Sequence, residues 1–189
     1  MNKFFVEIGS SDFDTLLPLA ELGWSGIIVE PLSECLNNLE RYDSVIYENV
    51  AIHSYNGETE FIYYDSSLMD DCGESKTWWT RGLGTTNLDM NHMINNPQWK
   101  KYERQITVDC LTLDSLLEKY EISEIDFMKV DVEGEECKIF VDYSWRVKPD
   151  VIKIESEHWN KMEKLTMKTM LIENGYLIWE ESNDWYSVR

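Results

Sequence analysis

The sequence is poor in basic residues, cysteine, histidine and proline. Its 189 residues include 17 Lys and Arg against 36 Asp and Glu, which gives a formal net charge of −19, and only 4 Cys, 3 His and 4 Pro. Nucleic acids and anionic membranes are bound by clustered Lys and Arg, so we expect neither as a partner. The cysteines follow no zinc-ligand spacing, and we expect them to be reduced thiols.

Long hydrophobic runs are absent as well. No uncharged stretch approaches the roughly 20 apolar residues that span a bilayer, and no apolar leader precedes the first strand-like run. Hydrophobic residues nevertheless make up 43% of the chain and aromatic residues 13%, as in a globular protein. We therefore expect a soluble, cytoplasmic protein that forms one domain over residues 1–189.

Strand and helix patterns alternate in the first part of the chain and again in the last part. Strands are predicted at residues 4–8, 26–29 and 44–52, with helices at 13–20 and 33–40 between them. The later elements are strands at 125–130 and 150–154, helices at 113–120, 135–143 and 165–173, and a closing hairpin of 176–179 and 185–188. Short connections between alternating strands and helices require parallel pairing, so we predict an α/β, Rossmann-like sheet of five parallel strands with a terminal antiparallel pair.

The middle of the chain breaks this alternation. Residues 59–64 and 105–111 are rich in β-branched and aromatic residues and predict an inserted β-hairpin. Between them, residues 65–103 have no clear periodicity and contain several Gly and Trp. A long patternless segment inside a compact domain is usually functional. We predict that the insertion at about 57–111 is a lid or a substrate-side loop.

Carboxylates stand at four of the five predicted parallel strand ends. In open α/β sheets, ligands bind beyond the carboxyl ends of the strands, where the strand order reverses. A carboxylate is costly to bury there without a partner, so a group of them indicates a binding site more than a set of turns. The residues concerned are Glu7, Glu30, Asp131 with Glu133, and Glu155.

The first turn argues against a ligand that carries phosphate. A dinucleotide fold needs Gly-x-Gly-x-x-Gly at this turn, whereas this chain has only Gly9, and Asp12 stands where the phosphate would lie. Glu30 ends the second strand, a position from which an acidic side chain accepts hydrogen bonds from the ribose hydroxyls of a nucleoside. An acidic edge without room for phosphate favours a cationic nucleoside, and S-adenosylmethionine is one.

Several motifs, in order along the chain, match a known family. They are residues 6–9 (Val-Glu-Ile-Gly), 29–31 (Val-Glu-Pro), 49–52 (Asn-Val-Ala-Ile), 111–116 (Leu-Thr-Leu-Asp-Ser-Leu) and 128–136 (Met-Lys-Val-Asp-Val-Glu-Gly-Glu-Glu). With these motifs the chain resembles the FkbM-like family of S-adenosylmethionine-dependent methyltransferases over residues 4–180. The resemblance implies a class I methyltransferase fold, S-adenosylmethionine as cofactor, and methyl transfer to a hydroxyl oxygen of a small molecule or sugar.

The resemblance also assigns residues to the cofactor. Glu7 would fix the first turn, Glu30 would hold the ribose, and Asp131 would lie beside the methionine amino group or the sulfonium. The other contacts to the methionine tail, the ribose and the adenine would come from Gly9, Ser10, Ser11, Pro31, Asn49, Ala51 and Ile52.

Transfer to a neutral hydroxyl needs a group that accepts its proton. The candidate catalytic residues are Asp131, Glu133 and His158, and the weaker candidates are Glu155, His53 and His92. We expect no bound metal; the alternative is Mg²⁺ held by Asp131, Glu133 and Glu155, since carboxylates suit hard cations. Residues of the insertion are expected to bind the acceptor, with Arg81 recognising an anionic group on it: Arg81, Gly84, Thr85 and Thr86.

Two other functions stay open. The family's first turn has a second Gly four residues after the first, whereas this chain has Phe13, which would narrow the space over the methionine tail. A catalytically inactive nucleoside-binding or scaffold domain of the same fold is therefore the alternative. A nucleic-acid methyltransferase is disfavoured by the net charge of −19.

Overall fold

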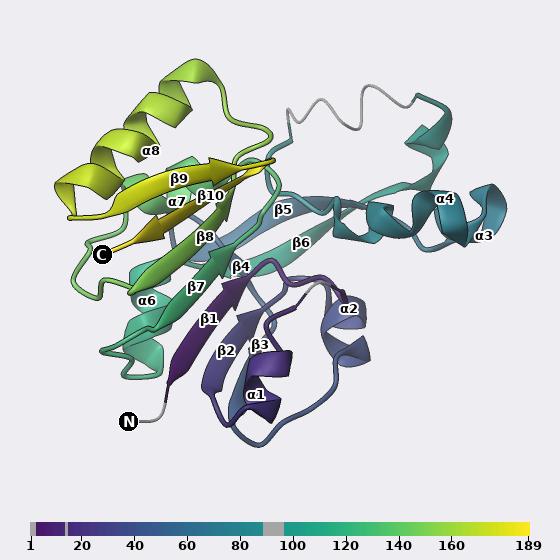
Figure 1. Ribbon diagram of the computed structural model, residues 1–189. Helices are drawn as coiled ribbons and strands as arrows, with labels where there is room; N and C mark the ends of the chain where they lie inside the picture. The colour runs from purple at the N-terminus through teal and green to yellow at the C-terminus, as the bar shows by residue number, and fades with distance from the viewer. Residues whose placement is uncertain (1–2, 14, 89–96) are drawn as a thin grey trace.

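The chain folds around one sheet of seven strands (Figure 1). The computed structural model describes residues 3–13, 15–88 and 97–189. Five strands are parallel and the last two are antiparallel, in the order β3-β2-β1-β7-β8-β10-β9. The strands are β1 (Phe4–Ile8), β2 (Ser25–Val29), β3 (Val45–Glu48), β7 (Phe127–Val130), β8 (Val151–Glu155), β9 (Leu177–Glu181) and β10 (Asp184–Val188). The predicted α/β sheet with its terminal antiparallel pair is confirmed.

Helices cover both faces of this sheet (Figure 1). Because successive side chains of a strand point to opposite faces, Phe5 of β1 lies in one apolar cluster and Val6 and Ile8 lie in another. Among the residues described, no helix combines the length and apolar character that a membrane span requires. The covering helices are α1 (Pro18–Glu21) and α2 (Ser33–Asn38) on one face, and α6 (Leu113–Lys119), α7 (Glu136–Val141) and α8 (Lys161–Glu173) on the other.

The inserted hairpin is present and belongs to a second sheet. Strands β5 (Gly57–Tyr64) and β6 (Glu103–Leu111) pair antiparallel, and β4 (Ala51–Ile52) runs parallel to β6 on its other side. The segment between β5 and β6, predicted as a loop, contains short helices, of which α3 and α4 extend away from the main sheet (Figure 1). These helices are α3 (Ser67–Cys72), α4 (Glu74–Thr77), η1 (Trp78–Gly82) and η2 (Pro97–Tyr102).

The single strand predicted at residues 44–52 is wrong, because this segment contributes to two sheets. Residues of β3 pair with β2, whereas β4 pairs with β6. Asn49 lies between them, and its side-chain amide donates hydrogen bonds to the carbonyl oxygens of Glu30 and Pro31, at 2.8 and 2.9 Å. An apolar run predicts that a strand is buried but not which strand it will pair with.

The first helix is shorter than the predicted 13–20. Pro18 has no N–H to donate, so a helix readily begins there. The N–H of Leu16 donates instead to the Oε2 atom of Glu7, at 2.8 Å. Leu16 is therefore held by a buried side chain of β1, and the helix begins only after Leu17.

The strand order reverses between β1 and β7, where the two strand ends approach closely. The N–H of Asp131 donates to the carbonyl oxygen of Ile8 at 3.0 Å. Gly9 has φ +78°, and a Cβ at this position would lie 1.8 Å from the carbonyl oxygen of Asp131. Both the conformation and the lack of space thus require glycine here.

We predict that Gly9→Ala lowers the free energy of unfolding by about 2–4 kcal/mol, from backbone strain plus overlap with Asp131. The matched control is Gly175→Ala, because Gly175 has φ +93° but nothing within 4 Å of the added methyl. This control isolates the conformational strain and should cost about 1–2 kcal/mol. Urea unfolding measures both variants. Equal losses would show that the close approach to Asp131 contributes nothing.

Candidate active site

A cavity of about 500 Å³ lies at the carboxyl ends of the central strands, where the strand order reverses. Segments from β1, β2, β7, β8 and the insertion all contribute to its wall. The predicted site residues that line it are Gly9, Ser10, Ser11, Glu30, Pro31, Ala51, Ile52, Arg81, Gly84, Thr86, Asp131, Glu133 and His158. These residues, which come from segments far apart in the chain, therefore line one cavity.

Three predicted site residues do not line the cavity: Glu7, Asn49 and Thr85. Glu7 is fully buried in β1, where its Oε1 atom lies 3.4 Å from Nζ of Lys129 and its Oε2 atom holds the segment before α1. Asn49 holds the backbone after β2, as described above. These side chains support the wall, because their polar atoms are engaged by the protein's own groups.

Glu30 is held by the backbone on either side of it. Its Oε2 atom accepts the N–H of Ser11 at 2.7 Å, and its Oε1 atom accepts the N–H of Leu32 at 2.9 Å. Burial raises the pKa of Glu30 to about 7, although both hydrogen bonds favour the ionised form. Each carboxylate oxygen has two lone pairs, so each oxygen retains one for a donor in the cavity.

Glu133 and His158 form a pair that joins the segments after β7 and β8. The Nε2 atom of His158 lies 3.0 Å from Oε2 of Glu133. Burial raises the pKa of Glu133, and the hydrogen bond to Glu133 raises the pKa of His158. Of the other histidines, His53 accepts the N–H of Ser54 at its Nδ1 atom and does not line the cavity, and His92 lies outside the described residues.

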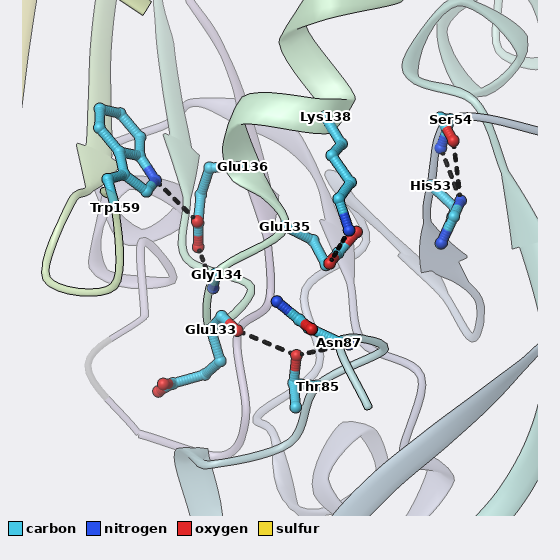
Figure 2. A network of polar contacts seen from close by, with 10 residues as sticks. All are labelled: His53, Ser54, Thr85, Asn87, Glu133, Gly134, Glu135, Glu136, Lys138 and Trp159. Atoms are coloured by element: carbon cyan, nitrogen blue, oxygen red, sulfur yellow. Dashed lines mark hydrogen bonds and ion pairs between the residues drawn. The ribbon is translucent and has the colours of Figure 1, made fainter. Parts of the chain in front are cut away.

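Glu136 holds the backbone around this pair (Figure 2). Its Oε1 atom accepts the N–H groups of Val132 and Gly134, at 2.9 and 3.2 Å, and its Oε2 atom accepts the indole N–H of Trp159, at 3.1 Å. Burial raises the pKa of Glu136 to about 7. One side chain thus fixes both the loop that carries Glu133 and the turn that carries His158.

Glu155, the last residue of β8, also lines the cavity. Burial, followed by the negative charges of Asp131 and Glu133, raises the pKa of Glu155 to about 10. Ligand atoms of Glu133, Glu155 and His158 all lie within 4.8 Å of one another, the one such group among the described residues. The side chains that geometry brings together as potential metal ligands therefore include His158 in place of Asp131.

The insertion contacts the site at two points. Thr85 donates a hydrogen bond to the carbonyl oxygen of Glu133 at 2.9 Å (Figure 2). Arg81 lies against the first turn, with its Nη1 atom 3.2 Å from Oδ2 of Asp12 and its guanidinium 5.3 Å from the centroid of the Phe13 ring. Since Arg81 is already paired with Asp12, an anionic group on an acceptor would have to compete with this contact.

Residues 4–178 match the model of the methyltransferase FkbM domain, which is nearly the whole chain. The chain belongs to the FkbM methyltransferase family. No curated protein sequence matches it. Among solved structures, it is similar to precorrin-6y C5,15-methyltransferase from Geobacter metallireducens GS-15, with 9% identity and a TM-score of 0.44, covering 99% of this chain and 78% of the other.

For this FkbM domain, no role was predicted from the sequence for Lys129 or Glu136, and neither was the packing partner of Phe13. Lys129 pairs with Glu7 across the register of β1 and β7, and a single Lys inside an apolar strand is a signal that a partner is needed. Phe13 lines the cavity and packs edge-on against Trp78, with ring centroids 5.3 Å apart. Glu136 belongs to the family motif, but its buried role depends on backbone geometry that no residue pattern reveals.

We predict that Thr85→Val loosens the insertion of this FkbM domain. The buried carbonyl of Glu133 would lose its donor, which costs about 1–3 kcal/mol, and residues 65–88 should become more susceptible to proteolysis. Thr107→Val is the control, because the hydroxyl of Thr107 makes an exposed hydrogen bond with Glu60 in the same hairpin. Urea unfolding and limited proteolysis of both variants test this. If Thr107→Val has the larger effect, the Thr85 contact is not what anchors the insertion.

Proposed function

We propose that this protein is an S-adenosylmethionine-dependent methyltransferase that methylates a hydroxyl oxygen of a small molecule or sugar. One observation carries the proposal: Glu30 and the Glu133–His158 pair line the same cavity, on opposite sides of the β1–β7 crevice. The reaction needs a group that holds the cofactor and a group that accepts the proton of the acceptor hydroxyl. Glu30 would serve as the first, and the Glu133–His158 pair would serve as the second.

The residues present fit the cofactor in size and chemistry. A volume of about 500 Å³ suits a ligand of this size. Glu30 keeps lone pairs for the ribose hydroxyls, and Leu32, Ala51 and Ile52 give an apolar wall for an adenine ring. The carboxylates along the wall attract a cation. When bound, S-adenosylmethionine supplies an activated methyl group.

The chain's own groups would align the acceptor, exclude water and accept the proton. Asp131, Glu133 and His158 all line the cavity, which supports a role in proton uptake for any of them. The insertion covers the same cavity with Trp79, Gly84 and Thr86, which supports its role in acceptor binding. The acidic wall favours a neutral or cationic acceptor over an anionic one, because like charges would repel.

The inactive-scaffold alternative rested on Phe13, whose ring lies against η1 of the insertion. Measurements of cofactor binding distinguish an inactive scaffold from a methyltransferase only when they are combined with assays of methyl transfer. A scaffold would bind S-adenosylhomocysteine and leave every acceptor unmethylated, whereas the enzyme would release S-adenosylhomocysteine with a suitable sugar or polyol.

We predict that S-adenosylhomocysteine binds to the protein and that Glu30→Gln lowers its affinity at least tenfold at pH 8. A tenfold loss corresponds to about 1.4 kcal/mol, as expected when two hydrogen bonds to the ligand are altered. Isothermal titration calorimetry is the measurement. The control is Glu34→Gln, which removes the same charge from an exposed position on α2 and should change the affinity less than twofold. No binding at millimolar ligand would remove the enzyme proposal, and equal losses in both variants would remove the role of Glu30.

We also predict that the affinity falls as the pH drops from 8 to 6. The pKa of Glu30 is raised to about 7, so lowering the pH protonates the carboxylate that should accept the ribose hydroxyls. Titration calorimetry across this range in wild type and Glu30→Gln is the test. The variant has no titrating group at this position, so its affinity should depend less on pH. A wild-type affinity that is constant from pH 6 to 8 contradicts the assignment.

A further inference from the structure

We propose that Glu133, Glu155 and His158 bind one divalent cation of the Mn²⁺ type in the wall of the cavity. The three side chains come from the loop after β7, the end of β8 and the turn that follows β8. All three line the cavity, so an ion held by them would be accessible to a ligand.

The spacing of these side chains is close to that of a coordination sphere. Their ligand atoms all lie within 4.8 Å of one another, and Nε2 of His158 lies 3.0 Å from Oε2 of Glu133. With metal–ligand bonds of about 2.0–2.2 Å, opposite ligands are about 4.0–4.4 Å apart and adjacent ones about 3 Å. The three ligand atoms are therefore close enough to one another to bind a single ion, which would replace the hydrogen bond between His158 and Glu133.

A buried atom at this place also calls for a ligand. The Oε2 atom of Glu155 exposes less than 1 Å² and has no hydrogen-bond partner among the residues that the structure describes. A buried carboxylate oxygen without a donor is costly. Glu136, in contrast, has donors on both of its oxygens. Of these two acids, Glu155 is the one that lines the cavity and the one with an oxygen that lacks a donor.

The local charge favours a cation as that ligand. Asp131, Glu133, Glu155 and Glu157 line this side of the cavity. Of the basic residues of the lining, Arg81 pairs with Asp12 and Lys129 pairs with Glu7. On binding, a divalent ion would displace the proton that Glu155 holds at neutral pH and would then balance the charges of the two carboxylates that bind it. One imidazole with two carboxylates is a donor set for Mn²⁺ or Zn²⁺ more than for Mg²⁺ or Ca²⁺, which prefer oxygen ligands alone.

The catalytic consequence rests on the proposed function. A cation here would bind the acceptor oxygen and favour loss of its proton, as a Lewis acid does. The O–H bond would break with its electron pair left on oxygen, and Asp131, which lines the cavity outside the ligand set, would take up the proton. The three candidate catalytic residues would then divide into two metal ligands and one base.

The test is a titration in which Mn²⁺ is added to protein freed of metal by a chelator. The electron paramagnetic resonance signal of the unbound ion is measured at each step and gives the amount bound. We expect one Mn²⁺ per chain, competed by Zn²⁺, and at least tenfold weaker binding in Glu155→Gln and in His158→Gln. Glu157→Gln is the matched control: Glu157 lines the same wall but lies outside the group of three, so binding should weaken less than threefold. Circular dichroism and thermal unfolding establish that each variant is folded.

Absence of saturable Mn²⁺ binding at millimolar concentration would overturn the proposal, as would equal losses in Glu155→Gln and Glu157→Gln. Binding of S-adenosylhomocysteine, measured separately in chelator, keeps the two proposals distinct. If the nucleoside binds and Mn²⁺ does not, the cation site is wrong and the methyltransferase proposal stands. If Mn²⁺ binds and the nucleoside does not, the cation site stands and the methyltransferase proposal is wrong.

Discussion

The architecture of the site depends on the hydrogen bonds that the buried carboxylate of Glu136 accepts. The loop before it contains two successive residues with positive φ, Glu133 at +57° and Gly134 at +97°, which is unusual backbone for a non-glycine residue. This conformation turns the N–H groups of Val132 and Gly134 toward one point, where Glu136 accepts both. Since its other oxygen accepts the indole of Trp159, the same side chain joins the ends of β7 and β8. Without this side chain, buried N–H groups would lack partners, and the loop after β7 and the turn after β8 would no longer be held together.

Several carboxylates are buried near this edge, and their partners distinguish two kinds. Glu7 has Lys129 and the N–H of Leu16, and Glu136 has three donors. These groups offset the cost of burial from within the protein and so stabilise the wall. Glu155 has an oxygen without a donor, and it is the one of these three that lines the cavity. Burial without compensation is unfavourable for folding, so its persistence at a cavity is typical of a functional site, where stability is given up for a ligand.

The sequence predicted the strand ends well because two independent signals coincide there. Apolar runs located β1, β2, β7 and β8, and the carboxylates or glycines that follow each run marked where the strands stop. Pairing partners were less predictable, since residues 45–48 and 51–52 have the same apolar character but join different sheets. The insertion was unpredictable in detail because its helices are short, and short helices depend on tertiary contacts more than on their own sequence. The roles of Thr85 and Glu136 depend on backbone groups, which are alike for every residue type.

Phe13 shows how a departure from the family pattern is accommodated. Its ring lies against Gly82 of η1, where an added Cβ would be 3.0 Å from Cζ of the ring, and the edge of the ring faces Trp78. The bulk that replaces glycine in the first turn therefore forms the surface to which the insertion binds. With the Arg81–Asp12 ion pair beside it and the hydrogen bond of Thr85 across the crevice, the insertion is attached on both sides of the β1–β7 junction. Displacing η1 would expose an aromatic ring and leave the buried carboxylate of Asp12 without its partner Arg81. A ligand that fills the space beside Phe13 would therefore contact the first turn and the insertion at the same time.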